Sequence, residues 1–326
     1  MSEGAGRVGV LVMAHGTPER PEDLEAFYTR IRRGRPPSVE QLDDLRRRYE
    51  AIGGLSPLAA RTGAQVAGLA ARLAEARPGR YEVRFGAKHT SPSIEEAGRA
   101  LVGPGGLDRV IGLVLTPHRS SMGSGEYLER AAGAVDPVPF VPVPRWYRAP
   151  GFAELQADRV TRARAQLGGD GPGAVVVFTA HSLPERVRSA GDPYPDDVAE
   201  SAELIARAAG LAAWRVAWQS AGRTPEPWIG PDILDVIREL AAQGVPAVVV
   251  CPVGFVADHL EVLFDIDVEA RQVAQGAGIR LARTASLNDD PGFLDVLARV
   301  VLAADDRAGV ADPAHPGPGG EEHLEP

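Results

Sequence analysis

The sequence predicts a doubly wound α/β fold made of two similar halves. Short apolar runs rich in β-branched residues alternate with longer segments of helical periodicity along most of the 326 residues. Continuous apolar strands of this kind are typical of parallel sheets covered by helices on both faces. Two of the runs lead into one shared pattern, at residues 14–18 (AHGTP) and 180–184 (AHSLP). A five-residue match can arise by chance. In a chain longer than the ~100–200 residues of an ordinary domain, however, it predicts related domains at 1–147 and 148–304.

The first half opens with a buried strand at residues 7–13 (RVGVLVM). In residues 21–33, apolar side chains recur at the spacing of one helical face, which predicts a helix. A second helix is expected over 38–52, where Ser38 and Gln41 have the spacing of a capping box and two glycines follow. The other elements expected in this half are helices at 57–75 and 93–101 and strands at 81–88 and 109–115.

The second half repeats the alternation. Its strands are expected at residues 174–179, 214–219, 247–251 and 279–283. Its helices are expected at residues 152–167, 195–209, 232–243, 258–271 and 292–302. Residues 305–326 are rich in Gly, Pro and acidic side chains and show no periodicity, so we expect a disordered tail there.

The composition excludes several classes of partner and site. The formal net charge of −9 argues against nucleic acid as a partner. The longest apolar run, Val8–Ala14, is far shorter than the ~20 residues of a membrane helix. The N-terminal segment lacks the pattern of a signal peptide, so a cytoplasmic protein is expected. Cys251 is the only cysteine, which excludes an intramolecular disulfide, a zinc site with two or more thiolates and a four-cysteine iron–sulfur cluster.

Four histidines follow predicted strands closely. His15, His89, His118 and His181 each lie near the C-terminal end of a strand, the edge at which open α/β sheets bind ligands. Any one of them can be a structural imidazole. Four at the same edge of the fold instead indicate a site there.

A stripe of carboxylates marks the segment 258–271. Glu261, Asp265 and Glu269 stand at i, i+4 and i+8, where like charges destabilise a helix by ~0.2–0.5 kcal/mol per pair. Hard oxygen ligands arranged in this way suit a divalent cation. The alternative is a helix start, because Asp258 and Glu261 have capping-box spacing and acids favour a first helical turn. That alternative leaves Asp265 and Glu269 unexplained, since they lie further into the helix.

Two weaker signals concern an anionic, flat ligand. Arginines cluster around residues 30–35 and 46–48, and they favour pairing with carboxylates or phosphates. Only Lys88 among the 35 basic residues is a lysine, so a solvated arginine face is the plainer interpretation. The loop around Trp228 is rich in Pro and Gly and could form an aromatic wall against a flat ligand, or simply a packed loop.

Six short motifs follow one another along the chain, at 53–58 (GGLSPL), 180–184 (AHSLP), 191–195 (GDPYP), 218–220 (WQS), 228–231 (WIGP) and 254–261 (GFVADHLE). Together they resemble the ferrochelatases, and their order and spacing fit this family from Val8 to Leu302. The similarity is greatest to the soluble coproporphyrin III enzymes of Gram-positive bacteria, including the actinobacterial type, and is carried by residues 28–34 and 48–58.

The resemblance implies two Rossmann-like, chelatase-type domains with a porphyrin cleft between them, and insertion of Fe²⁺ into coproporphyrin III in haem biosynthesis. His181 matches the family's cleft histidine and Glu261 the facing glutamate, so both are expected to be catalytic and to bind the metal. Asp265 and Glu269 match an acidic stripe that leads outward and are expected to bind metal as well. The residues expected to contact the macrocycle or its propionates are Arg32, Arg48, Tyr49, Ser56 and Tyr127.

His15 departs from the family pattern. Bacillus-type members carry a tyrosine at this position, where it is a candidate axial ligand of the inserted iron. Because imidazole also ligates iron, we expect His15 to bind substrate, with its role as an axial ligand left open.

The resemblance implies Fe²⁺ as a substrate and no permanently bound cofactor. Some relatives hold a [2Fe–2S] cluster through cysteines, which a chain with one cysteine cannot do. The expected partners are coproporphyrin III and Fe²⁺, with the downstream coproheme decarboxylase as a candidate, and the chain is expected to be a monomer. The alternatives are a chelatase for protoporphyrin IX or another divalent metal, and a non-catalytic porphyrin or haem carrier.

Overall fold

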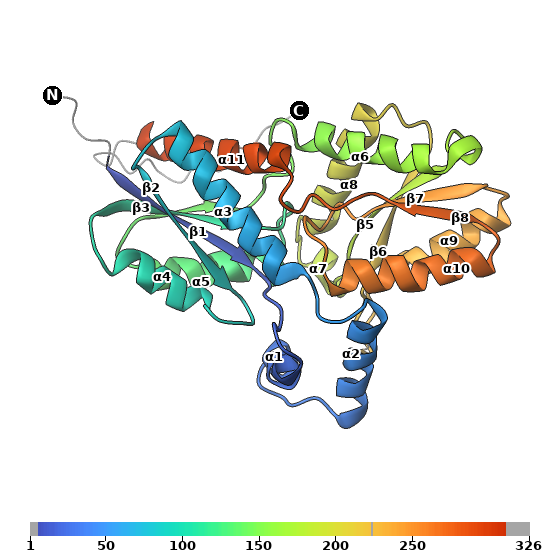
Figure 1. The fold of residues 1–326 in the computed structure, drawn as a ribbon, viewed down its shortest axis with the longest axis horizontal. Helices are drawn as coiled ribbons and strands as arrows, with labels where there is room; N and C mark the ends of the chain where they lie inside the picture. The colour runs from blue at the N-terminus through green and yellow to red at the C-terminus, as the bar shows by residue number, and fades with distance from the viewer. Residues whose placement is uncertain (1–5, 223, 311–326) are drawn as a thin grey trace.

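The computed structural model describes residues 6–222 and 224–310 and contains two four-stranded parallel sheets side by side (Figure 1). The first sheet has the order β2-β1-β3-β4 and the second the order β6-β5-β7-β8, so both halves repeat one topology. This confirms the predicted doubly wound α/β class. The strands are β1 (Arg7–Ala14), β2 (Tyr81–Ala87), β3 (Leu107–Val114), β4 (Phe140–Val143), β5 (Val175–His181), β6 (Trp214–Gln219), β7 (Ala247–Cys251) and β8 (Arg280–Arg283).

Most of the expected helices form within a few residues of their predicted bounds. The predicted capping box is present, because Ser38 accepts from the Gln41 backbone and the Gln41 side chain accepts from the Ser38 backbone. The helices are η1 (Pro21–Asp23), α1 (Leu24–Ile31), α2 (Val39–Ala51), α3 (Leu58–Ala76), α4 (Ile94–Val102), η2 (Ser121–Gly125), α5 (Glu126–Val135), α6 (Phe152–Gln166), η3 (Gly168–Asp170), α7 (Arg186–Ser189), α8 (Tyr194–Ala208), α9 (Ile233–Ala242), η4 (Val262–Ala270), α10 (Arg271–Gly276) and α11 (Pro291–Val310).

Alternation along each central strand assigns the helices to two layers. In β1, Val10 packs in one cluster with Leu69 of α3, whereas Leu11 packs in another with Ile94 of α4. In the second half, Val177 of β5 faces α9 and α10, and the strand's other face packs against α6 and α8. Both sheets are therefore covered on both faces, as the continuous apolar strands predict.

α1 and α2 form a small helical unit below the junction of the two halves (Figure 1). Leu24, Leu42 and Tyr49 make its core, and Leu260 of the second half packs against it. α2 also contacts η4. This unit thus joins the first half to the helix that carries the acidic stripe.

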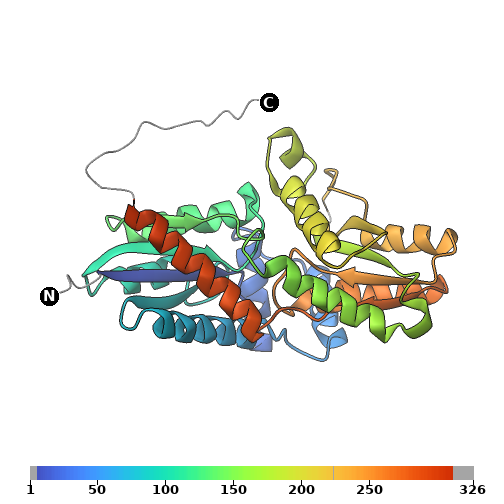
Figure 2. The same ribbon diagram turned by 90° about the horizontal axis from the view of Figure 1, so that it is seen from above.

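The last helix, α11, returns to the first half and corrects the expected domain division. It contacts α3, β3 and β4, and Figure 2 shows it, in red, running back across the first half. Its apolar residues, among them Phe293 and Val301, are buried in the same cluster as Leu73. The domain expected at 148–304 therefore gives its final helix to the first sheet, because that sheet would otherwise expose an apolar face.

Residues 305–310, which the sequence places in a disordered tail, are helical instead. α11 continues to Val310, and the Asp305 side chain is fully buried. Arg80 donates to its carboxylate at 2.7 Å and Tyr81 at 2.7 Å, while Arg77 and Arg109 pair with it at 3.0 and 3.2 Å. Residues 311–326 of the expected tail lie outside the described residues.

Asp305→Asn is expected to destabilise the fold by about 2–3 kcal/mol, because it leaves partly buried guanidinium groups without their counter-charge. Urea unfolding measures this change. Asp306→Asn, at an exposed position paired with Arg77, should change stability by less than about 1 kcal/mol. Equal effects of the two variants would contradict the proposed role of Asp305.

The Asp305 carboxylate also makes the stability of the fold depend on pH. Burial opposes ionisation of Asp305, but Arg80 and Tyr81 outweigh it and lower the Asp305 pKa below 3.8. Its stabilisation is therefore present above pH 3.8 and is lost as the pH falls from there towards the lowered value.

Within residues 6–222 and 224–310, none of the helices combines the length and apolar character needed to cross a bilayer.

Candidate active site

A cavity of about 650 Å³ opens between the two halves, at the C-terminal ends of their strands. The four histidines that follow predicted strands, His15, His89, His118 and His181, all line it. The strand-end prediction is therefore confirmed for the whole set. The volume is that of a typical small-molecule site.

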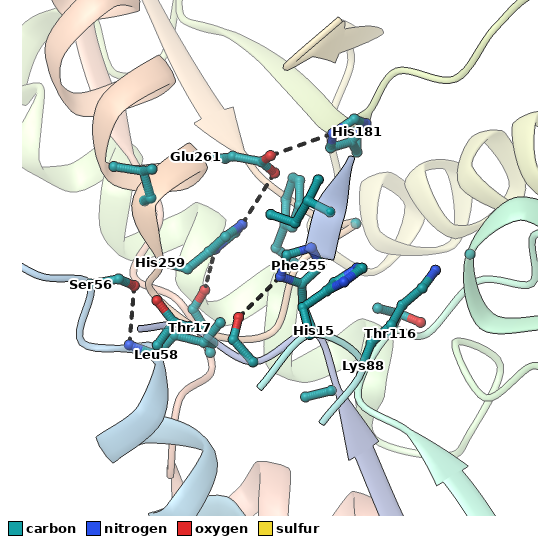
Figure 3. A pocket seen from close by; sticks show the side chains of 18 of the residues that line it. His15, Thr17, Ser56, Leu58, Lys88, Thr116, His181, Phe255, His259 and Glu261 are labelled. Atoms are coloured by element: carbon teal, nitrogen blue, oxygen red, sulfur yellow. Dashed lines mark hydrogen bonds and ion pairs between the residues drawn. The ribbon is translucent and has the colours of Figure 1, made fainter. Parts of the chain in front are cut away.

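The centre of the cavity holds a carboxylate between two imidazoles (Figure 3). His181 Nε2 lies 3.5 Å from Glu261 Oε1, and His259 Nε2 lies 3.6 Å from Glu261 Oε2. Each ring donates its Nδ1 proton to a backbone carbonyl, His181 to Ser182 and His259 to Ala257. Both Nε2 atoms are thus oriented towards the same carboxylate.

The turn after β7 brings Glu261 to His181. The Gly254 N–H donates to the Thr179 carbonyl at 3.1 Å, so the turn lies directly against β5. A Cβ on Gly254 would stand 2.7 Å from the Ala180 Cβ, which only glycine avoids. The segment then enters a helix at Leu260 with Glu261 facing the strand end.

Charge coupling shifts both members of the pair. Burial lowers the His181 pKa, but the neighbouring Glu261 carboxylate outweighs it and raises the pKa to about 9. Burial disfavours the Glu261 carboxylate, but His181 and His259 hold its pKa well below the usual value. At neutral pH the resting pair is therefore an imidazolium and a carboxylate.

The helix that follows is a π-helix rather than the expected α-helix over 258–271. Val262–Ala270 has the wider π turn, a rare geometry that occurs frequently at functional sites. Asp265 is buried one turn beyond Glu261 and accepts from Ser220 Oγ. Burial and the nearby Glu261 and Glu269 charges raise the Asp265 pKa to about 6. Glu269 is half-buried one turn further from the cavity.

Two other acids of this segment are turned away from the stripe. Arg283 of β8 lies between Asp258 and Asp267, at 3.3 and 2.9 Å. Asp258 also accepts from Ser286 and Asn288. These two carboxylates are neutralised inside the second half, so they are not part of the stripe formed by Glu261, Asp265 and Glu269.

The first half contributes neutral imidazoles. His15 and His89 have ring centroids 4.6 Å apart. Burial and the nearby His15 lower the His89 pKa to about 3, and burial lowers the His15 pKa as well. Burial alone lowers the His118 pKa to about 3, and neither ring nitrogen of His118 has a hydrogen-bond partner within the described chain.

Basic and hydroxyl groups line the rim. Arg32 and Arg48 line the cavity, and Arg48 pairs with Asp44 at 3.3 Å while approaching Asp265 at 4.0 Å. Lys88 lies 5.0 Å above the Tyr127 ring and pairs with Glu126 at 2.8 Å. Tyr49, Ser56 and Tyr127 also line the cavity, and their contact with a macrocycle stays a prediction.

Three expected site residues lie elsewhere among the described residues. Asp265 and Glu269 are behind the cavity lining, along the π-helix. Trp228 is not part of the described lining, because its indole N–H donates to Thr224 at 2.9 Å and the ring packs over Gly222. The wall expected from Trp228 is formed by Ala221 and Thr224 of the same loop.

His259 is the main site residue that the sequence reasoning did not assign. It stands two residues before Glu261, a spacing that places side chains on different faces of a helix. His259 lies outside the helix, which begins only at Leu260, so the helical spacing rule does not apply to it and both side chains meet. The sequence 258–261 (DHLE) could have indicated His259, because it places a histidine close to the predicted metal-binding glutamate. Tyr194, which lines the cavity and donates to the His181 carbonyl at 3.0 Å, was also missed.

Replacing Glu261 by glutamine is expected to lower the His181 pKa from about 9 to below 6.5, because burial then acts without the opposing charge. Titration of the histidine ring signals by NMR measures this shift. Glu203→Gln, on the outer face of α8, is the control and should leave the titration unchanged. A His181 pKa that stays near 9 in Glu261→Gln would contradict the assigned coupling.

Comparison with known proteins gives one consistent result. The ferrochelatase family model matches residues 7–305. A relative from Geobacillus thermodenitrificans, named coproporphyrin III ferrochelatase, is 46% identical over 305 residues, covering 90% of this chain and 95% of the relative. A relative of the same name from Bacillus subtilis is 44% identical over 302 residues, covering 91% and 97%.

Solved structures share the fold. SirB from Bacillus subtilis with Fe³⁺ matches with a TM-score of 0.58 and 15% identity, over 93% of this chain and 97% of that one. CbiX, described as the terminal enzyme for biosynthesis of siroheme in denitrifying bacteria, matches with a TM-score of 0.55 and 18% identity, over 91% and 99%. The family model matches residues 7–305 and the two relatives cover 90% and 91% of the chain, and on that basis the chain belongs to the ferrochelatase family.

Proposed function

We propose that this chain inserts Fe²⁺ into coproporphyrin III, forming coproheme and releasing two protons, as a step of haem biosynthesis. The observation that carries the proposal is the pairing of His181 with Glu261 at 3.5 Å inside the cavity between the halves. Coproporphyrin III is proposed as the substrate because both relatives bear the name coproporphyrin III ferrochelatase. A divalent cation and a proton acceptor are the two things that metallation of a free-base porphyrin requires.

Iron delivery uses the carboxylate side of the site. Glu261 is ionised and offers oxygen ligands to a hard dication. Asp265 and Glu269 continue this side along the π-helix and provide a path from solvent. Carboxylate oxygens hold Fe²⁺ more weakly than soft, high-field ligands do, so the ion can be surrendered to the ring nitrogens.

Proton removal uses the imidazole side. The two pyrrole protons must leave as the Fe–N bonds form. An approaching dication competes with the His181 proton for the Glu261 carboxylate and so lowers the His181 pKa. The imidazolium then releases its Nε2 proton to water, and the free Nε2 accepts a pyrrole proton. His259, on the other side of Glu261, is placed to take the second proton. Each acceptor keeps its Nδ1 bond to a backbone carbonyl throughout.

Substrate binding uses the rim. Coproporphyrin III carries four propionates, and charge-assisted pairs with Arg32, Arg48 and Lys88 suit carboxylates. The hydroxyls of Tyr49, Ser56 and Tyr127 lie at the same cavity and can donate to further oxygens. His15, from the first half, lines the same cavity as His181, and its role as an axial ligand stays a prediction.

Steady-state iron insertion with two porphyrins tests the substrate. Under anaerobic conditions with Fe²⁺, kcat/KM should be higher for coproporphyrin III than for protoporphyrin IX, which has two propionates fewer to pair with the rim arginines. A higher kcat/KM for protoporphyrin IX would assign the chain to the other branch of chelatases.

Replacing Asp265 by asparagine together with Glu269 by glutamine is expected to raise the apparent KM for Fe²⁺ about tenfold or more, since the path loses both charges. The kcat at saturating Fe²⁺ should change little, because Glu261 remains. Asp267→Asn, on the same helix but paired with Arg283, is the control and should leave the Fe²⁺ KM unchanged. An unchanged KM in the double variant would argue against an iron path.

Three further proposals concern the context of the reaction. Fe²⁺ acts as a substrate, and the chain works without a resident cofactor. Its one thiol, Cys251, is buried in β7, where burial raises the thiol pKa to about 12. A monomeric state, a cytoplasmic location and hand-over of coproheme to its decarboxylase stay predictions.

A further inference from the structure

One wall of the cavity comes from a loop of the first half that is fastened to the second half. This wall loop, residues 119–125, follows β3 and includes η2. Ser120, Met122, Gly123 and Ser124 line the cavity. Inside the loop, Ser120 Oγ accepts from the Gly123 N–H at 3.2 Å, and Ser124 Oγ accepts from the Ser120 N–H at 3.1 Å. The loop therefore has a defined shape of its own.

The fastening point is Asp192, in the turn between α7 and α8 of the second half. The Ser121 N–H donates to Asp192 Oδ2 at 2.7 Å, and Ser121 Oγ donates to the same oxygen. Asp192 is 8% exposed, so these bonds are shielded from water. Its other oxygen, Oδ1, accepts from the Tyr194 N–H at 2.9 Å. One carboxylate thus holds both the wall loop and the start of α8.

A second carboxylate supports the same junction. Asp197, one turn into α8, is 3% exposed. It accepts from the Arg119 N–H at 3.2 Å and pairs with Arg145 at 3.0 Å. Tyr147 also donates to it at 3.2 Å. Asp192 therefore acts on a rigid platform and not on a free turn.

The same turn reaches the reactive histidine. The Tyr194 hydroxyl donates to the backbone carbonyl of His181 at 3.0 Å, and its ring lines the cavity. A continuous set of contacts therefore runs from Ser121 through Asp192 and Tyr194 to His181. It crosses the cleft and connects the wall on one side with the proton acceptor on the other.

We propose that Asp192 is a positioning residue for metal insertion, which sets the separation between the wall loop and His181. The proposal rests on the proposed function, because it concerns where the macrocycle sits relative to the acceptor. Reacting groups misplaced by about 1 Å can lose about 10²-fold in rate. A porphyrin held against a displaced wall presents its ring centre away from His181, while the rim that binds the propionates is unaltered.

The test compares Asp192→Asn with Asp196→Asn, an exposed acid in the first turn of α8, in the full-length protein. Asp192→Asn should lower kcat for iron insertion about 10- to 100-fold and change the KM for coproporphyrin III less than about threefold. The absorption and out-of-plane vibrational bands of bound coproporphyrin III should shift with it. Asp196→Asn should match the wild type in all three measurements.

Milder substitutions at two other positions, Ser121 and Tyr194, keep the proposal testable should Asp192→Asn fail to fold. Ser121→Ala removes one bond to Asp192 and should lower kcat about tenfold, whereas Ser121→Thr retains the hydroxyl and should restore it. Tyr194→Phe removes the bond to the His181 carbonyl. In a Tyr194→Phe background, Ser121→Ala should cost much less, since both changes interrupt one set of contacts.

The possible results separate the two hypotheses. Wild-type kcat and unshifted porphyrin bands in folded Asp192→Asn or Ser121→Ala would overturn the positioning role while leaving iron insertion intact. A rise in KM at unchanged kcat would also overturn it, because that would make the loop a simple binding surface. A wild-type chain that inserts no iron would instead refute the proposed function itself.

Discussion

His181→Ala is expected to lower kcat for iron insertion about 10²–10⁴-fold, the usual contribution of a positioned proton acceptor. His181 Nε2 lies beside Glu261, and its backbone is fixed at the end of β5. Anaerobic assays that follow porphyrin absorption measure the rate. Coproporphyrin III binding, measured by fluorescence quenching, should change little because the rim is unaltered.

A second variant and a stability measurement check that the lost rate reflects the missing proton acceptor. His181→Asn keeps a polar side chain of similar size but accepts no proton at neutral pH, so it should be as inactive as His181→Ala. The raised His181 pKa also carries a stability term that is full below pH 6.5 and is lost as the pH rises through about 9. The difference in stability between wild type and variant should therefore shrink over that interval. Full activity in either variant would remove His181 from the mechanism.

Glu261→Gln is expected to lower kcat/KM for Fe²⁺ by about 10² or more, because a neutral amide replaces the carboxylate that receives the dication. The fold should be retained, since the amide has the same shape and the neighbouring imidazoles remain. Steady-state rates at varied Fe²⁺ concentration measure the effect. Unlike the paired change at Asp265 and Glu269, this substitution should not be rescued by saturating iron.

The control for this variant is Glu203→Gln, an exposed glutamate that pairs with Arg207 on α8. It has the same chemical change and lies away from the cavity. Wild-type rates are expected for it. Equal rates for Glu261→Gln and Glu203→Gln would show that the central carboxylate is not needed.

Strands that are buried on both faces were predictable because their apolar runs leave little choice of structure. β7 forms at Ala247–Cys251, the range that the sequence predicts. β4, at Phe140–Val143, was missed because Pro142 interrupts the run, a feature that only an edge strand tolerates. The other edge strands, such as β6 at Trp214–Gln219, formed where the sequence predicts them, so the proline and not the edge position explains the missed strand.

Features that depend on distant residues were not predictable. Asp305 stands in a segment whose composition suggests disorder, yet its partner Arg80 lies 225 positions earlier in the chain. The π-helix at Val262–Ala270 has the acidic spacing of an α-helix, and no local signal marks its wider turn. In both cases the local sequence does not specify the observed structure.

In the candidate site, too, some features were predictable from the sequence and others were not. The strand-end histidines were predictable because the topology of parallel sheets brings strand ends together. The facing of His181 and Glu261, 80 positions apart, came only from the family resemblance. Trp228 shows the limit of composition, because a suitable residue in a suitable loop turns its ring onto Gly222 instead of into the cavity.

The most direct test of iron insertion is a single anaerobic mixing of the purified protein with Fe²⁺ and coproporphyrin III. Absorption of the porphyrin and the release of protons to a pH indicator are followed together. The visible bands of the free base should be replaced by those of the metalloporphyrin, with two protons released per iron and repeated turnover when substrate is in excess. Tight porphyrin binding with no change of bands and no proton release would contradict the account and leave the chain a porphyrin carrier.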